Sequence, residues 1–209
     1  MKETRLSAFH AEEYSISKHY HIKRNNMNGS RALSENEINR MMTIANPRDR
    51  LLILTGINFG TRISEALELK FSDVEGKTLR LKSKKKSNNQ EYPIPESYKD
   101  AIKEVRKYYR ILEIEPKQHS PMFMSTHIKT GKAMTIQNAL SIMRLLAKKA
   151  GAEGKVSFHS FRKSFVTRIY ERTGFNIAET QKYSRHKSLS NLEYYIHTTD
   201  SMDLVCDGL

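Results

Sequence analysis

Residues 48–70 read RDRLLILTGINFGTRISEALELK and carry the clearest structural signals in the chain. The apolar positions predict a helix over about residues 48–58, whose buried side chains are expected to be Leu51, Leu52 and Leu54. Gly60 breaks this helix, because glycine readily takes backbone conformations that end one. A second helix is expected over residues 62–70. The stretch therefore predicts two consecutive helices joined at a glycine.

The segment just before it carries a helix-start signal. Ser34 and Glu37 form the pattern S-x-x-E, a capping box, and Leu33 stands where a hydrophobic staple would. The apolar residues continue at helical spacing through Ile38, Met41 and Met42. This helix is expected to end near residues 46–47, where Asn-Pro follows.

Further along, the periodicity changes from helix to strand and back again. Leu79 and Leu81 alternate in a short strand over residues 78–82, a basic loop (KSKKKSNNQ) follows, and a second strand ends in residues 92–95 (YPIP). This pattern predicts a small antiparallel hairpin. Helices are expected at about residues 97–114, 135–150, 160–172, 177–183 and 190–197. The predicted fold class is mainly α with a small antiparallel β-sheet (α+β).

Composition points to a basic globular protein. Of 209 residues, 38% are hydrophobic, which suffices for one ordinary core. Lys and Arg number 36 against 23 Asp and Glu, a formal charge of +13 that attracts polyanions, nucleic acid above all. An unspecialised basic protein is the other interpretation of the charge. The sequence shows no secretory signal or membrane-spanning run, and its one cysteine excludes a disulfide framework, so a cytoplasmic location is expected.

Three separated segments carry the chemistry. The first is residues 60–67, GTRISEAL, and the second is residues 159–162, HSFR. The third is His186, followed nine residues later by Tyr195 and then by His197. In order and spacing they resemble the G-x-R-x-x-E-L, H-x-x-R and G-H…Y boxes of the tyrosine recombinase (phage integrase) family. The resemblance covers residues 33–199, essentially the whole catalytic domain, and implies the integrase catalytic-domain fold.

The residue types suit cleavage of a phosphodiester by a tyrosine hydroxyl. Such a reaction places charge on the nonbridging phosphate oxygens, and guanidiniums are permanently charged and bind phosphate in a bidentate way. Arg62 and Arg162 are the candidates. His159 lies one helical turn before Arg162, on the same face, and can donate to a phosphate oxygen or accept the tyrosine proton. His186 would help to fix the phosphate or the phenol.

The nucleophile is expected to be Tyr195. Its neighbour Tyr194 is the alternative, but the spacing from His186 favours Tyr195. A phenol has a pKa near 10, so it needs a nearby base and a positive field. The resemblance further implies that a lysine of the hairpin loop protonates the leaving 5′ oxygen. Lys84 is the best match, and the competing loop lysines, expected to bind DNA, are Lys82, Lys85 and Lys86.

Other interpretations of these residues stay open. Arg62 can be a helix-start arginine paired with a neighbouring acid, and Glu65 is expected to be a structural support rather than a chemical participant. The three histidines at 159, 186 and 197 suggest a metal, but the sequence contains no H-E-x-x-H or C-x-x-C motif. We therefore expect no metal and no cofactor, including ATP, because a phosphotyrosine ester conserves the energy of the broken bond.

Two departures from the family pattern are visible. Most relatives carry a helical core-binding domain before the catalytic domain, whereas residues 1–32 are too few for one. They are expected to form a basic arm, either a flexible segment along DNA phosphates or a disordered tail. Short relatives resembling the recombinases that invert fimbrial promoters have this architecture. Secondly, Arg185 stands where a glycine normally precedes the histidine, and this cation either assists DNA binding or distorts His186.

The resemblance implies a site-specific recombinase that works on double-stranded DNA as a homotetramer, with or without host or accessory DNA-binding proteins. Apolar residues in the tail, 200–209, are expected to dock on a neighbouring subunit. Two other functions compete. A type IB topoisomerase-like enzyme uses the same chemistry on one duplex, and an accessory factor would bind DNA without cutting it. The complete set of site residues argues against the accessory factor.

Overall fold

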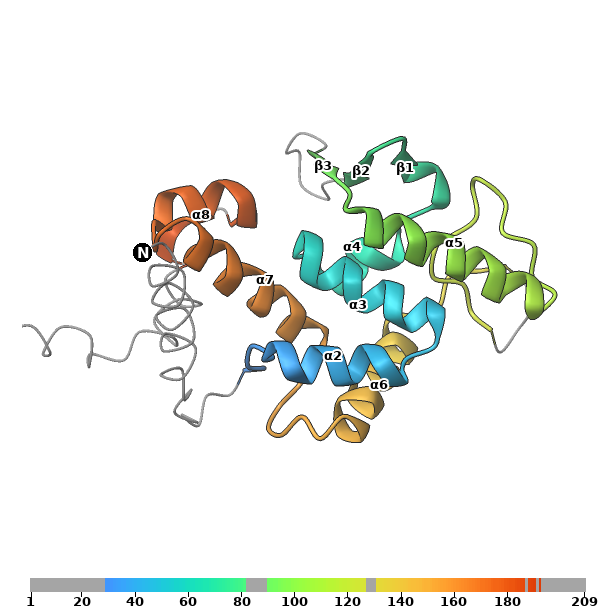
Figure 1. Cartoon of the computed structure of the whole chain (residues 1–209), viewed down its shortest axis with the longest axis horizontal. Coiled ribbons are helices and arrows are strands. Elements are labelled where there is room, and N and C mark those ends of the chain that lie inside the picture. Colours follow the sequence, from blue (N-terminus) through green and yellow to red (C-terminus); the bar gives the residue numbers. More distant parts are fainter. Residues whose placement is uncertain (1–28, 82–89, 127–130, 187, 191, 193–209) are drawn as a thin grey trace, which may run out of the picture.

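The computed structural model describes residues 29–81, 90–126, 131–186, 188–190 and 192. In this part of the chain the fold is mainly helical with a small antiparallel sheet, which confirms the predicted class (Figure 1). Residues 190–197, expected to be helical, lie largely outside the described part. The elements in chain order are α2 (Glu35–Ile44), α3 (Pro47–Phe59), α4 (Ile63–Leu67), the 3-10 helix η1 (Phe71–Asp73), β1 (Val74–Glu75), β2 (Thr78–Leu81), β3 (Gln90–Pro93), α5 (Glu96–Ile111), α6 (Ile136–Lys149), α7 (Phe158–Arg172) and α8 (Ile177–Ser184).

Helix α3 is the central element and packs against both α7 and α5 (Figure 1). Its side chains Leu51, Leu52 and Ile53 are fully buried, because helices cover it on more than one side. Gly56 allows α7 to come close, since a Cβ added there would lie 2.8 Å from Cβ of Phe161. The apolar run that predicted this helix therefore marks the core of the molecule.

The start of α2 follows the predicted capping box. Ser34 Oγ accepts from the amide of Glu37 at 3.3 Å, and the Glu37 carboxylate accepts from the Ser34 amide at 2.9 Å. Leu33 is buried, and Ser164 of α7 bonds both its amide and its carbonyl. Arg31, within the expected arm, also contacts the folded part through Glu37 and the carbonyl of Glu153.

One local prediction was wrong. The helix expected over residues 62–70 ends at Leu67, because the next residues pair with a distant segment. The carbonyl of Leu69 accepts from Met122 at 2.8 Å, and the amide of Phe71 donates to Ser120 at 3.1 Å. The expected hairpin is confirmed as β2 and β3, and β1 adds a third strand in the order β1-β2-β3, with Leu79 opposite both Val74 and Tyr92. Leu79 and Leu81 are buried and Arg80 is exposed, as the alternation predicted.

The turn after α3 is sterically tight. Gly60 has a left-handed backbone (φ 55°), and a Cβ there would overlap the ring of Phe165 on α7. Gly76 has almost the same φ, 57°, but a Cβ there would meet nothing within 4 Å. The two glycines therefore share a conformational requirement and differ in their surroundings.

We predict that Gly76→Ala lowers the free energy of unfolding by about 1–2 kcal/mol, the cost of a left-handed alanine. Gly60→Ala should lower it by about 1–3 kcal/mol more, because the added methyl also overpacks against Phe165. Urea unfolding of the two variants beside the wild-type protein measures both effects. Equal losses of unfolding free energy in the two variants would mean that α3 and α7 can move apart at Gly60 without cost.

Candidate active site

Arg162 is the most deeply buried charged side chain among the predicted site residues that the structure describes, at 1% exposure. It projects from α7 and donates from Nη1 to the carbonyl of Gly60 and from Nη2 to the carbonyl of Ser184 at 2.9 Å. Gly60 caps α3 and Ser184 is the last residue of α8. The Arg162 side chain therefore joins three helices at one point, and its planar group is held in a fixed orientation.

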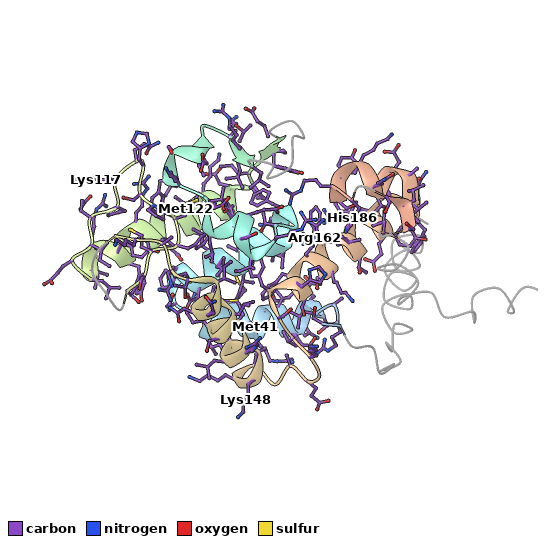
Figure 2. All side chains as sticks on the ribbon, turned by 180° about the vertical axis from the view of Figure 1, so that it is seen from behind. Met41, Lys117, Met122, Lys148, Arg162 and His186 are labelled. Atoms are coloured by element: carbon purple, nitrogen blue, oxygen red, sulfur yellow. The ribbon has the colours of Figure 1, made fainter. Side chains whose placement is uncertain are left out.

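His186 lies beside this guanidinium (Figure 2). Its Nε2 is 3.4 Å from Arg162 Nη2, and its Nδ1 is 2.8 Å from Ser184 Oγ. Because a guanidinium can only donate, these contacts favour the tautomer in which Nε2 accepts and Nδ1 carries the proton. Burial and then the positive charges of Arg162, Arg62, His159 and Arg185 lower the pKa of His186 to about 4. The ring is therefore neutral at physiological pH.

Arg62 reaches the site from the start of α4. Its amide donates to Glu65 Oε2 and its Nη1 to Glu65 Oε1, each at 2.8 Å. The Arg62 side chain stays 59% exposed whereas that of Glu65 is 9% exposed, so the guanidinium has a face open to solvent. Arg62 is thus both a helix-start arginine paired with an acid and an accessible cation. Glu65 has the supporting position expected from the sequence.

The Glu65 carboxylate is shared between two arginines. Its Oε2 also lies 3.4 Å from Arg185 Nη2. Burial raises its pKa, but hydrogen bonds from Arg62 and the charges of Arg185 and Arg62 outweigh burial, so the pKa of Glu65 is lowered overall. Glu65 therefore remains an anion and fixes the positions of both cations.

His159 is the second residue of α7 and is exposed at the surface, in contrast to Arg162 one turn later. Partial burial and the charges of Arg162, Lys163 and Arg62 lower the pKa of His159. His159 therefore lies within electrostatic reach of both predicted catalytic arginines. Like His186, it is mostly neutral at pH 7, which suits a group that accepts a proton.

Arg185 faces the protein interior. It caps α8 with a left-handed backbone (φ 58°), and its Nη2 donates to the carbonyls of Phe59 and Gly60 at 3.1 and 3.2 Å. Sequence reasoning had offered DNA contact or distortion of His186 as the roles of this residue. The observed contacts are with the end of α3 and with Glu65, which favours a structural role in holding the site together.

Two participants were missed by sequence reasoning. The ring of Tyr92 on β3 lies 5.8 Å from the guanidinium carbon of Arg185, and burial raises the pKa of Tyr92 while the charges of Arg185 and Arg162 lower it in part. The carbonyl of Gly60 accepts from two arginines. A tyrosine after a basic loop carries no functional signal in a single sequence, so Tyr92 was not detectable. Gly60 stands in the first box, but a motif does not show which side chains donate to its carbonyl.

The remaining predicted residues fall outside the described part of the chain. These are Tyr195 with its alternative Tyr194, His197, and the loop lysines Lys82, Lys84, Lys85 and Lys86. The strands that flank the loop, β2 and β3, are described, and Tyr92 of β3 lies near the guanidinium of Arg185. The assignments of nucleophile and acid therefore stay predictions.

The described residues contain neither a metal-ligand cluster nor a helix fit to cross a membrane. No cluster of three or more His, Cys, Asp or Glu side chains arranged to hold a metal ion occurs there. None of the helices in these ranges combines the length and the apolar character that crossing a membrane requires.

Comparison with known proteins places these features in context. Residues 31–202 match the model of the phage integrase family. The chain is 32% identical over 161 residues to the probable integrase/recombinase YoeC of Bacillus subtilis, covering 77% of this chain and 83% of that protein. It is 29% identical over 175 residues to the tyrosine recombinase XerA of Pyrococcus furiosus, covering 81% of this chain but only 58% of that protein.

The fold is also that of a solved recombinase. The crystal structure of the XerH site-specific recombinase bound to its difH substrate, a pre-cleavage complex, superposes with a TM-score of 0.67 at 21% identity. The match covers 88% of this chain and 54% of that one. At this identity the likeness establishes the fold, and the predicted integrase catalytic-domain fold is confirmed.

We predict that the His186 ring titrates with a pKa near 4 in NMR spectra of the free protein. The unfolded chain, with an ordinary histidine pKa, binds more protons than the native state between about pH 6.5 and 4. This histidine should therefore destabilise the fold as the pH falls through that window. Arg62→Met removes one of the lowering charges and should raise the pKa of His186. A pKa near 6.5 in the wild-type protein would contradict the described position of His186.

Proposed function

Because the chain belongs to the phage integrase family, we propose that it is a site-specific recombinase that cuts and rejoins DNA through a covalent link to Tyr195. The observation that carries the proposal is the convergence of Arg62 at the start of α4, Arg162 on α7 and His186 just after α8. Two fixed guanidiniums beside two neutral histidines suit an anion that gains charge during reaction, such as a phosphodiester.

In the proposed cleavage step the Tyr195 oxygen attacks phosphorus and gives up its proton. The bond from phosphorus to the 5′ oxygen breaks, and that oxygen takes a proton, so one ester replaces another. Arg162 and Arg62 would bind the nonbridging oxygens as their charge grows, and preorganised donors of this kind typically contribute about 10²–10³ in rate each. Rejoining is the same step in reverse, with the freed 5′ hydroxyl as nucleophile.

The two histidines have distinct places in this scheme. The exposed ring of His159, with its lowered pKa, is the better candidate to accept the proton of Tyr195. The ring of His186 is held between Ser184 and Arg162, which suits a group that fixes the phosphate. The general acid is Lys84 in our proposal, and Lys82, Lys85 and Lys86 would contact DNA phosphates.

Double-stranded DNA is the proposed substrate and partner. The formal charge of +13 favours a polyanion, and the XerH structure is described as bound to its DNA substrate. A homotetramer on DNA, with or without accessory DNA-binding proteins, and a cytoplasmic location remain part of the proposal. The relatives are named recombinases, and nothing favours a topoisomerase or an accessory factor over that activity.

We predict that Tyr195→Phe forms no covalent protein–DNA adduct, because phenylalanine has no hydroxyl to attack the phosphate. Nicked duplexes tiled across the DNA that flanks the gene serve as substrates, and a denaturing gel separates the adduct from free DNA. Tyr194→Phe is the matched control and should retain the adduct. If only Tyr194→Phe abolishes it, the nucleophile is misassigned, and if the wild-type protein never forms it, the proposed activity is wrong.

We predict that Lys84→Ala cleaves ordinary DNA poorly but cleaves DNA with a 5′ bridging sulfur at close to the wild-type rate, because a thiolate leaves without needing a proton. The same change at Lys82, Lys85 or Lys86 should instead weaken binding and lower the salt dependence by about one unit of slope per lysine. If the sulfur substrate restores cleavage by Lys86→Ala instead, the general acid is Lys86. If it restores cleavage by none of the four variants, the general acid is not a lysine of this loop.

A further inference from the structure

Arg185 occupies a backbone position that disfavours it. Its φ of 58° and ψ of 30° are left-handed, a conformation in which the Cβ of an L-residue crowds the following carbonyl. Glycine takes this conformation without strain and is the common residue just after a helix. An arginine that keeps such a backbone needs compensating contacts from its side chain.

The compensating contacts are with the end of α3. Arg185 Nη2 donates to the carbonyls of Phe59 and Gly60, at 3.1 and 3.2 Å. The last carbonyls of a helix have no partners within the helix and carry partial negative charge, so a cation is favourable there. The Arg185 side chain is only 16% exposed, and its Nε is buried without a hydrogen-bond partner in the described part of the chain. The group therefore faces inward.

The partners of Arg185 are also the partners of the two predicted catalytic arginines. The Gly60 carbonyl accepts from Arg162 as well as from Arg185. The Glu65 carboxylate, 3.4 Å from Arg185 Nη2, accepts from both the amide and the guanidinium of Arg62. Removal of Arg185 would leave Glu65 to Arg62 alone and free one side of the Gly60 carbonyl.

We propose that Arg185 is a positioning residue that orients Arg62 through Glu65 and Arg162 through the Gly60 carbonyl, an inference that rests on the proposed recombinase function. His186 follows directly in the chain, so the same left-handed turn also directs its ring toward Arg162. In this proposal the guanidinium of Arg185 holds the other site residues in place and does not contact the substrate. A contact with a DNA phosphate is the competing role, and the inward orientation of the side chain argues against it.

Three variants distinguish the effect of the left-handed backbone at position 185 from the effect of the Arg185 side chain. Arg185→Gly loses the guanidinium but relieves the left-handed strain, whereas Arg185→Ala loses the guanidinium and keeps the strain. Arg185→Lys keeps the strain and the charge. We expect both Gly and Ala to lower the single-turnover rate of adduct formation at saturating DNA at least about tenfold, as misplaced catalytic groups do. Of these two variants, only Arg185→Ala should also lower Tm, because it keeps the backbone strain. Arg185→Lys should be faster than Arg185→Ala, because it keeps the positive charge.

The matched control is Lys182→Ala, which removes one exposed positive charge from the same helix. It should leave the adduct rate unchanged. Wild-type rates for Arg185→Gly and Arg185→Ala would overturn the proposal. A weaker DNA affinity with a lower salt slope and an unchanged saturating rate would also overturn it, in favour of a phosphate contact.

Amide hydrogen exchange tests the same contacts without DNA. The Arg62 amide donates to Glu65, so its exchange should accelerate several-fold in Arg185→Gly and Arg185→Ala but not in Lys182→Ala. If the wild-type protein forms no adduct, the proposed function fails, and this measurement still decides whether Arg185 holds Glu65. Unchanged exchange in both Arg185 variants would overturn the positioning role on its own.

Discussion

The guanidinium of Arg162 has to be satisfied inside the protein, and much of the described architecture meets that requirement. A buried cation without acceptors costs several kcal/mol, so the chain must supply oxygens around it. It does so with the carbonyls of Gly60 and Ser184, which lie at the C-terminal ends of α3 and α8. Free carbonyls and the negative end of the helix dipole meet the positive charge at both places. Arg162 of α7 thereby holds the C-terminal ends of α3 and α8 close together.

The ends of those helices depend on two left-handed residues. Gly60 turns the chain out of α3 so that Arg62 begins α4, and Arg185 turns it out of α8 so that His186 faces Arg162. The α3–α7 contact is also close one turn earlier, where Gly56 lies against Phe161. Small residues on α3 thus set the distance from which α7 presents Arg162. The contacts that pack α3 against α7 therefore also set the positions of the predicted catalytic residues.

Sequence alone predicted what depends on neighbouring residues. Ser34 and Glu37 cap α2 as a local pattern requires, and the alternation of Leu79 and Leu81 predicted β2. The end of α4 was missed because residues 69–71 bond to residues 120–122, a partnership that no local pattern encodes. For the candidate site, residue type and spacing predicted Arg62, Arg162 and His186, which the structure brings together. They did not reveal that Arg162 is buried or that Arg185 turns inward, since both depend on where the end of α3 lies.

The charges around the site explain why its histidines are neutral in the free protein. Burial and then the surrounding arginines lower the pKa of both His159 and His186, because a further positive charge there would be repelled. A bound phosphodiester brings a negative charge to the same arginines, and a nearby anion favours the protonated form of a histidine. We therefore expect the pKa of each ring to rise when the phosphate binds and to rise further as charge grows on its oxygens during attack. In the proposed reaction the bound phosphate itself would therefore make His159 a stronger base for the proton of the tyrosine.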